Sequence, residues 1–137
     1  MKILNKKARY DYEILSKYEA GLELTGLEAK AVRKGDVDLS RSFAKIIGLE
    51  AFLINASIAI HSEAKFDPRR TRKLLLHRQE ILKIEAKLKE KKLTLVPLSL
   101  YTRGRLIKAE IALAKAKREF EKKEKIKARD LEREGTI

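Results

Sequence analysis

The stretch FLINASIAI, residues 52–60, carries the clearest structural pattern in the chain. Large or small apolar side chains recur at every second position, which is the period of a strand with one buried face. A surface helix would instead repeat its apolar residues every three or four positions. The stretch therefore predicts a β-strand. The alternating positions are Phe52, Ile54, Ala56, Ile58 and Ile60.

Further strands are predicted on both sides of this stretch. Residues 43–47 form one that Gly48 ends. Residues 93–101 form another, in which Pro97 marks an edge position or a bulge because proline cannot donate a ladder hydrogen bond. Alternating apolar residues over 107–113 predict the last strand, after a short turn.

The amino-terminal part predicts two more strands. Tyr10, Tyr12 and Ile14 alternate with polar residues, and Leu22 and Leu24 indicate a second short strand. Five or six short strands interrupted by helical patterns are typical of a small barrel of the OB type. We therefore expect a mainly β fold, an OB-like antiparallel β-barrel with flanking helices.

Capping signals place the helices. Thr25 is followed three residues later by Glu28, as in a capping box, and Gly35 suits the end of the helix that follows. Asp67–Pro68 resembles another helix start, with aspartate as the cap and proline at the first position. Helical spacing then continues through residues 78–91, and residues 61–66 are expected to form a loop.

The chain is strongly basic. It has 137 residues, enough for one compact domain, with 33 Lys and Arg against 20 Asp and Glu, a net charge of +13. Such a charge favours polyanionic partners, either nucleic acid or an anionic membrane surface. There is no cysteine, which excludes disulfides and thiolate metal sites. No apolar run resembles a signal peptide or a membrane span, so a cytoplasmic location is expected.

The composition changes at Lys115. The segment from there to Ile137 has nine basic and six acidic residues and few large apolar ones, too few to offset the entropy of ordering it. Pairs such as Glu119 with Lys123 favour a helix. Residues 1–114 are therefore expected to form the barrel, and residues 115–137 a flexible, helix-prone basic tail.

Catalytic patterns are weak. His61 and His77 lie near no triad-like arrangement, and Asp36 with Asp38 reads as an ordinary polar turn. Gly21 and Gly26 have the spacing that opens a phosphate-binding loop, but Leu27 and Glu28 stand where Lys and Ser or Thr are required. We expect no enzyme, no metal and no cofactor.

Basic clusters point to RNA. Residues 65–78 hold six basic residues and one acid, and a second cluster lies at residues 6–9. Arginine forks suit phosphate oxygens, whereas the few aromatic residues favour recognition of a folded RNA over stacking on single strands. An OB-type ribosomal protein or translation factor binding rRNA is the nearest alternative. A membrane-surface protein fits less well, because the tail has no apolar helical face.

The same stretches resemble a known family, the SsrA-binding protein (small protein B). The matching pieces follow the family's order and cover nearly the whole chain. They are NKKAR at 5–9, YEAG at 18–21, EAKAVRKG at 28–35, DPRRTRKLLLHRQE at 67–80, LTLVPLSLY at 93–101 and EIALAKAK at 110–117. Three positions depart from the family: Tyr10 for a frequent His, Ala116 for a Gly, and Glu121-Lys122-Lys123 for Asp-Lys-Arg.

The resemblance implies partners and a mechanism. It implies binding to the tRNA-like domain of transfer-messenger RNA and delivery of that RNA to stalled ribosomes, with no membrane and no small-molecule substrate. The tail would enter the empty mRNA channel at the small-subunit decoding region and fold there as a helix. The tail residues expected to contact the channel are Lys117, Arg118, Glu121, Lys122, Lys123, Lys125 and Lys127.

The resemblance also implies RNA-binding roles for three residues. Asn5 can donate and accept at a base edge or ribose, Glu19 can accept from a 2′-hydroxyl or base amine, and Leu75 can pack on a base. Without the resemblance, Leu75 would be expected in the core. The residues expected to hold phosphates are Lys7, Arg9, Arg70, Arg72 and Lys73.

Overall fold

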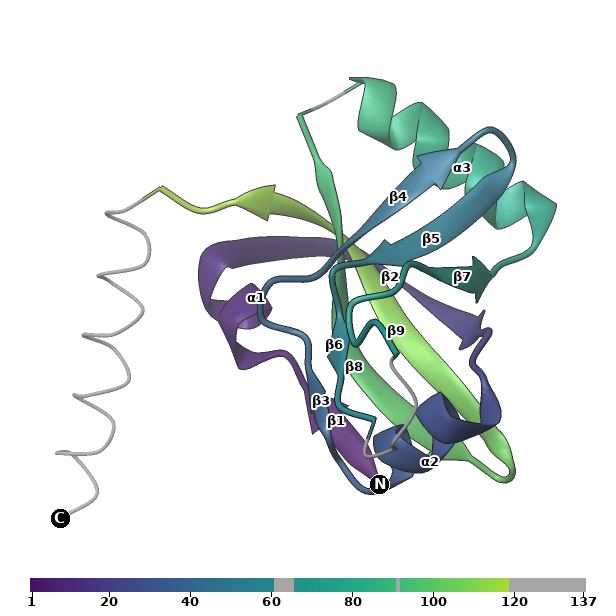
Figure 1. Cartoon of the computed structure of the whole chain (residues 1–137). Helices are drawn as coiled ribbons and strands as arrows, with labels where there is room; N and C mark the ends of the chain where they lie inside the picture. The colour runs from purple at the N-terminus through teal and green to yellow at the C-terminus, as the bar shows by residue number, and fades with distance from the viewer. Residues whose placement is uncertain (61–65, 91, 119–137) are drawn as a thin grey trace, which may run out of the picture.

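A computed structural model describes residues 1–60, 66–90 and 92–118 (Figure 1). Three helices and nine strands occur in these residues. The helices are α1 (Lys6–Asp11), α2 (Gly26–Arg33) and α3 (Arg78–Glu90). The strands are β1 (Lys2–Leu4), β2 (Tyr12–Leu22), β3 (Val37–Asp38), β4 (Phe43–Ile47), β5 (Glu50–Ile54), β6 (Ser57–Ile58), β7 (Arg72–Leu75), β8 (Thr94–Arg103) and β9 (Leu106–Ala116).

Six strands close into a ring of antiparallel pairs. The order runs β8, β4, β5, β7, β2 and β9, and β9 pairs again with β8. Closure satisfies the strand edges, which is how small barrels avoid exposed ladders. The expected mainly β, OB-like barrel is confirmed, although the described residues contain more strands than the five or six predicted.

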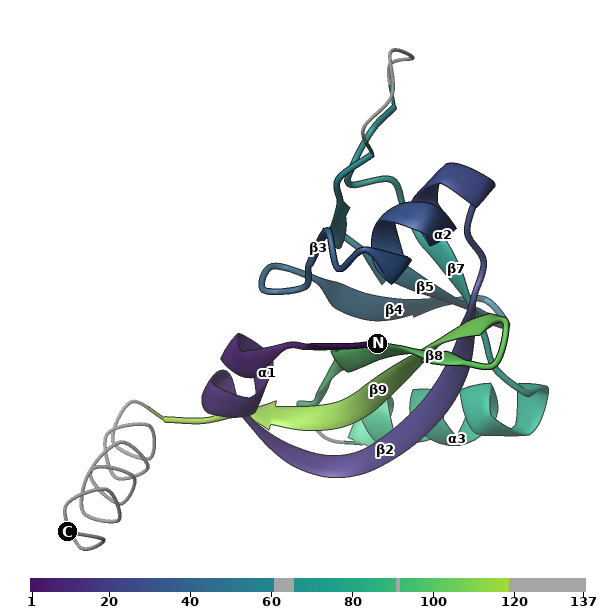
Figure 2. The same cartoon turned by 90° about the horizontal axis from the view of Figure 1, so that it is seen from below.

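The barrel interior is filled by large aliphatic side chains. Leu53, Leu74, Leu95, Leu100 and Ile111 are each at most 1% exposed. Burying a side chain of this size contributes roughly 1.5–3 kcal/mol. Figures 1 and 2 show α2 and α3 at opposite ends of the barrel, so that each helix covers an opening of the core.

The stretch at residues 52–60 is not one continuous strand. Asn55 adopts a left-handed backbone conformation with φ +65°, which asparagine tolerates better than most residues. The break separates β5 from β6 and changes which face is buried. Leu53 is fully buried, while Phe52 and Ile54 lie half-buried on the outer face of the barrel. The prediction of a nine-residue strand was wrong, because an alternating pattern does not show that the set of buried positions shifts by one residue at Asn55.

The amino-terminal prediction was also wrong in part. Residues around Tyr10 form the short helix α1, because Asn5 caps it and Ala8 is buried beneath it. β2 then continues without interruption to Leu22, where two separate strands were expected. Figure 2 shows β2 sweeping from α1 towards α2.

Asp67–Pro68 does not begin a helix. The carboxylate of Asp67 accepts a hydrogen bond from the backbone N–H of Arg69 at 2.9 Å, which closes a turn before β7. Helix α3 begins only at Arg78, so the helical spacing predicted from that residue is confirmed. No helix in the described part of the chain is long and apolar enough to cross a membrane.

Other local predictions are confirmed. Thr25 and Glu28 form a reciprocal capping box, and Gly35 closes the helix with φ +82°. The β4 strand spans Phe43–Ile47 and is followed by a left-handed Gly48. The pairing of β8 with β9 shifts register just after Pro97, as expected for a bulge at a residue that lacks an N–H.

Candidate nucleic-acid interface

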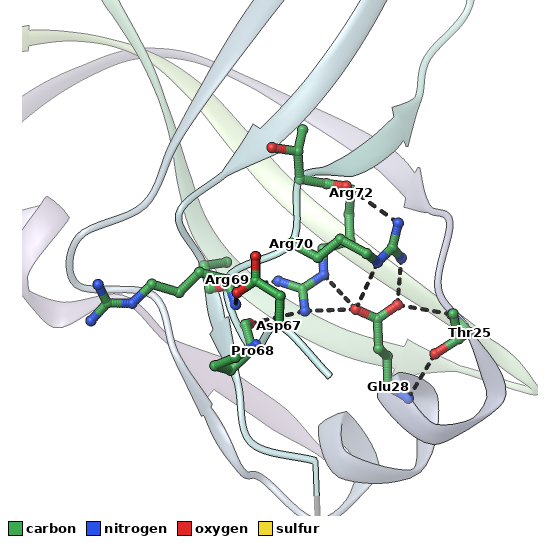
Figure 3. A network of polar contacts seen from close by, with 9 residues as sticks. Thr25, Glu28, Asp67, Pro68, Arg69, Arg70 and Arg72 are labelled. Carbon is green, nitrogen blue, oxygen red and sulfur yellow. Dashed lines mark hydrogen bonds and ion pairs between the residues drawn. The ribbon is translucent and has the colours of Figure 1, made fainter. Parts of the chain in front are cut away.

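Glu28 on α2 is a buried carboxylate that binds two arginines of the basic segment at residues 65–78. Arg72 donates from Nε to its Oε2 at 2.6 Å, and Arg70 donates from Nη2 to its Oε1 at 2.5 Å (Figure 3). The backbone N–H of Thr25 adds a third donor at 3.0 Å. Burial alone would raise the pKa of Glu28, but the hydrogen bonds from Arg70, Thr25 and Arg72 lower it to about 2.

Arg72 is enclosed by the fold. Its side chain is 0% exposed, and its remaining guanidinium nitrogens donate to the carbonyl oxygens of Ala56 at 2.7 Å and Pro68 at 3.0 Å. An enclosed guanidinium whose donors are engaged cannot reach a phosphate. The expectation that Arg72 holds RNA phosphates is therefore corrected: it ties β7 to α2 and to the corner between β5 and β6.

The neighbouring cations remain at the surface. The side chain of Arg70 is 46% exposed while it also bonds Glu28, and that of Lys73 is 41% exposed. Figure 3 shows Arg69 pointing away from Glu28. The buried Glu28–Arg72 pair thus supports a segment that presents positive charge outward.

Asn5 is likewise part of the framework. It is 3% exposed, and its Oδ1 accepts from the backbone N–H of Ala8 at 3.2 Å. Its Nδ2 donates to the carbonyl oxygens of Leu39 at 3.1 Å and Pro97 at 2.9 Å. These bonds anchor α1 on the barrel, and the expected base contact of Asn5 stays a prediction.

Helix α1 presents the second basic cluster. Lys7 and Arg9 are exposed, and Arg9 lies 3.8 Å from Glu110. A hollow of about 280 Å³ beside the helix is lined by Lys7, Tyr12, Arg41 and Phe43 among others. The chain leaves the barrel beside this helix. The backbone N–H of Lys117, just after β9, donates to the backbone carbonyl oxygen of Asp11 at 2.9 Å.

Glu19 lies on the outer face of β2 and is held by two side chains of β8. Tyr101 donates its hydroxyl hydrogen to Glu19, and Arg103 donates to both carboxylate oxygens, at 2.9 and 3.1 Å. The Tyr101 hydrogen bond is the main cause that lowers the pKa of Glu19. Burial and then Glu19 raise the pKa of Tyr101 to about 12. Glu19 is therefore an ionised acceptor in a fixed orientation.

Leu75 is at the surface, not in the core. It is 51% exposed and lies opposite Gly21 in the β2–β7 pairing. Beside it is a hollow of about 340 Å³, which we name the Gly21–Leu75 hollow. Its apolar lining includes Leu24 and Leu106, the latter 60% exposed. The remaining lining residues are Leu22, Ala29, Arg33, Arg105, Ile107 and Lys108.

The sequence did not reveal the cationic rim of this hollow. Arg33 ends α2 and Arg105 lies in the β8–β9 turn, and the fold joins them through a hydrogen bond from Arg33 Nη2 to the carbonyl of Arg105 at 3.0 Å. Residues from segments so far apart in the chain carry no shared local pattern. In the sequence, the available signal is the turn residue Gly104 followed directly by Arg105 and Leu106.

The structure divides the predicted residues into two groups. Glu19, Lys73 and Leu75 lie on the outer face of the sheet, and Arg70 lies just before β7, the strand that carries Lys73 and Leu75. Lys7 and Arg9 lie at the opposite end of β2, whose 11 residues span roughly 30 Å along the strand. Lys117 and Arg118 follow β9. The other expected tail residues, Glu121, Lys122, Lys123, Lys125 and Lys127, lie outside the described residues.

Comparison with known proteins identifies the family. The family model described as SmpB protein matches residues 2–136. The chain belongs to the SmpB protein family. Within this family, an SsrA-binding protein of Sulfurihydrogenibium sp. (strain YO3AOP1) is 53% identical over 133 residues, covering 95% of this chain and 88% of the relative. One of Acaryochloris marina (strain MBIC 11017) is 50% identical, covering 95% and 87%.

A solved SmpB-family structure has the same fold. It is described as "tmRNA-SmpB: a journey to the center of the bacterial ribosome" and superposes with a TM-score of 0.73 at 45% identity. The match covers 86% of this chain and 85% of that one. The family resemblance inferred from the sequence is thereby confirmed for both sequence and fold.

Proposed function

We propose that this chain binds transfer-messenger RNA, also called SsrA RNA, and delivers it to stalled ribosomes. Its curated relatives are named SsrA-binding protein, and the description of the solved structure of similar fold names tmRNA-SmpB and the bacterial ribosome. The net charge of +13 suits a polyanionic partner. Family membership favours this function over that of an rRNA-binding ribosomal protein.

The Gly21–Leu75 hollow is the observation that carries RNA binding. Its leucines offer a flat apolar surface to a base or sugar, and Arg33, Arg105 and Lys108 lie where phosphates would pass. Glu19, oriented by Tyr101 and Arg103, supplies an acceptor on the same outer face for a 2′-hydroxyl or base amine. Positioned acceptors and cations together suit a folded RNA better than a uniform basic surface would.

The opposite end of β2 is proposed to face the ribosome. Lys7, Arg9 and the exit of the chain at Lys117 lie together there. The basic segment 115–137 is proposed as the part that enters the empty mRNA channel, while residues 1–114 hold the RNA. We further propose that the protein acts in the cytoplasm, where its ribosome partner is, and by binding alone, without catalysis.

The test is to purify the tagged full-length chain and sequence the RNA that accompanies it. Transfer-messenger RNA should be strongly enriched over rRNA. The double variant Arg33→Ala/Arg105→Ala should lose that enrichment, whereas Lys83→Ala, an exposed cation on α3, should retain it. Recovery of rRNA without transfer-messenger RNA would contradict the proposed function.

A further inference from the structure

The outer face of β4, β5 and β7 gathers aromatic and basic side chains that are scattered in the sequence. The strand register places Lys45 opposite Phe52, and Phe52 opposite Lys73. Directly opposed residues of an antiparallel ladder share a face, so the Phe52 ring lies between two lysines. We name the surface formed by Phe43, Lys45, Phe52 and Lys73 the Phe43–Phe52 face.

Burial confirms that this face points outward. Leu53 and Leu74, which alternate with Phe52 and Lys73, are at most 1% exposed and fill the core. Phe43 is 39% exposed, and Ile47 beyond it is 56% exposed. Contiguous apolar and aromatic side chains at a protein surface are typical of interaction sites.

The two rings are spaced for successive ligands. Phe43 pairs with Ile54, two residues from Phe52, so Phe43 and Phe52 are diagonal neighbours whose Cα atoms lie roughly 7–8 Å apart. Aromatic rings at such spacing on a sheet can each stack on one unpaired base, while nearby cations contact the phosphates of the nucleic acid. Both lysines are next to a ring, as this arrangement requires.

The charge of the face decides between RNA and a protein partner. Glu50 is the one acidic residue of β4, β5 and β7, and it forms an exposed ion pair with Lys73 at 3.7 Å. Lys45 and Lys73 against Glu50 give the outer face of these strands a net positive charge. An apolar protein surface would bury the two ammonium groups at a cost, whereas phosphates would neutralise them. The chemistry therefore favours a single-stranded nucleic acid.

We infer that the Phe43–Phe52 face binds unpaired nucleotides of the RNA partner, with bases stacked on the two rings and phosphates at Lys45 and Lys73. This rests on the proposed RNA binding and adds to it a single-stranded contact. The sequence favoured folded RNA over stacking, because few aromatic residues accompany its basic clusters. The pairing of β4 with β5 and of β5 with β7 places Phe52 beside two lysines that are distant from it in the chain.

The test is a fluorescence-anisotropy titration of the full-length chain with a labelled octamer of uridylate. Phe43→Ala should weaken octamer binding at least about fivefold, since each stacked base contributes substantially. Phe52→Leu preserves apolar volume but removes the flat ring, and should weaken binding in the same way. Leu82→Ala, which removes an exposed apolar side chain from α3, should have no effect. Thermal unfolding checks that each variant is folded.

A parallel titration with the tRNA-like domain separates this inference from the proposed function. Loss of octamer binding in both phenylalanine variants, with smaller losses for the tRNA-like domain, supports the stacking face. Octamer binding that is absent, or indifferent to both rings, overturns it even if the tRNA-like domain binds. In that case the face would be a protein contact instead. Failure to bind either RNA overturns both proposals.

Discussion

Arg72 donates a 2.6 Å hydrogen bond to Glu28 at a place where neither side chain is more than 2% exposed. A buried ion pair adds little net stability by itself, because both charges lose their hydration. Removing one partner, however, leaves the other charge buried without compensation. The pair therefore matters most as a constraint that joins α2 to β7, the elements that flank the exposed cations.

Arg72→Ala is expected to destabilise the fold by about 3–5 kcal/mol. Denaturant unfolding measures this loss, with Arg69→Ala as the control, because Arg69 is an exposed neighbour whose removal should change stability by less than about 0.5 kcal/mol. If Arg72→Ala kept full stability and weakened RNA binding, Arg72 would be a phosphate contact after all.

Acid should weaken the fold through Glu28. Its pKa in the folded protein is about 2, below its ordinary value of 4.5, so the stabilisation is complete above pH 4.5 and is lost as the pH falls towards 2. The shift corresponds to about 3 kcal/mol. Unfolding free energies measured from pH 6 to 2 should show this decline.

The matched variant is Glu28→Gln, which cannot ionise. It should be less stable at pH 6 and should lack the Glu28 part of the acid dependence. Glu90→Gln, at an exposed position of α3, should keep the full decline. An identical pH profile for Glu28→Gln and the parent chain would refute the role given to this carboxylate.

Gly21→Ala should disturb the RNA site more than the fold. A Cβ at position 21 would lie 3.1 Å from the Cβ of Leu75 and 3.3 Å from its Cδ1, so Leu75 must move within the hollow. Affinity for the tRNA-like domain should fall several-fold in a gel-shift titration, with little change in binding to an unrelated duplex. Equal losses for both RNAs would show that the substitution merely harms the fold.

The fold was largely predictable because its barrel depends on local alternation and turns. Pro97 and Gly48 are examples in which backbone chemistry alone fixed a bulge and a strand end. Arg72 could not be placed from its type, since arginine is rarely buried without a partner, and that partner is 44 residues away at Glu28. The outward orientation of Phe52 could not be predicted either, because the buried positions shift by one residue at Asn55.

The candidate site was less predictable than the fold. The cationic stretch containing Arg70 and Lys73 was visible as composition, but composition does not separate Arg70 at the surface from Arg72 in the core. The hollow beside Leu75 requires Arg33 and Leu106, which meet only when the ring of strands closes. The resemblance pointed to Asn5 as well, and the structure shows it engaged within the fold.

Tail removal should separate RNA binding from rescue. β9 extends to Ala116, and Lys117 still bonds Asp11, so a cut after Arg118 preserves the barrel better than one after Ala114. The shortened chain should bind transfer-messenger RNA with nearly full affinity yet fail to support tagging in a translation assay. Lys125→Pro should act similarly if the tail works as a helix. Full tagging by the shortened chain would rule out the channel role.

The most direct measurement is a gel-shift titration of the full-length chain with the tRNA-like domain of transfer-messenger RNA at several salt concentrations. Selective binding is predicted over an unrelated duplex of the same length. Neutralisation of about five phosphates predicts that log K falls against log salt with a slope of about −3.5 to −4.5. A flat salt response, or equal affinity for the unrelated duplex, would contradict the account.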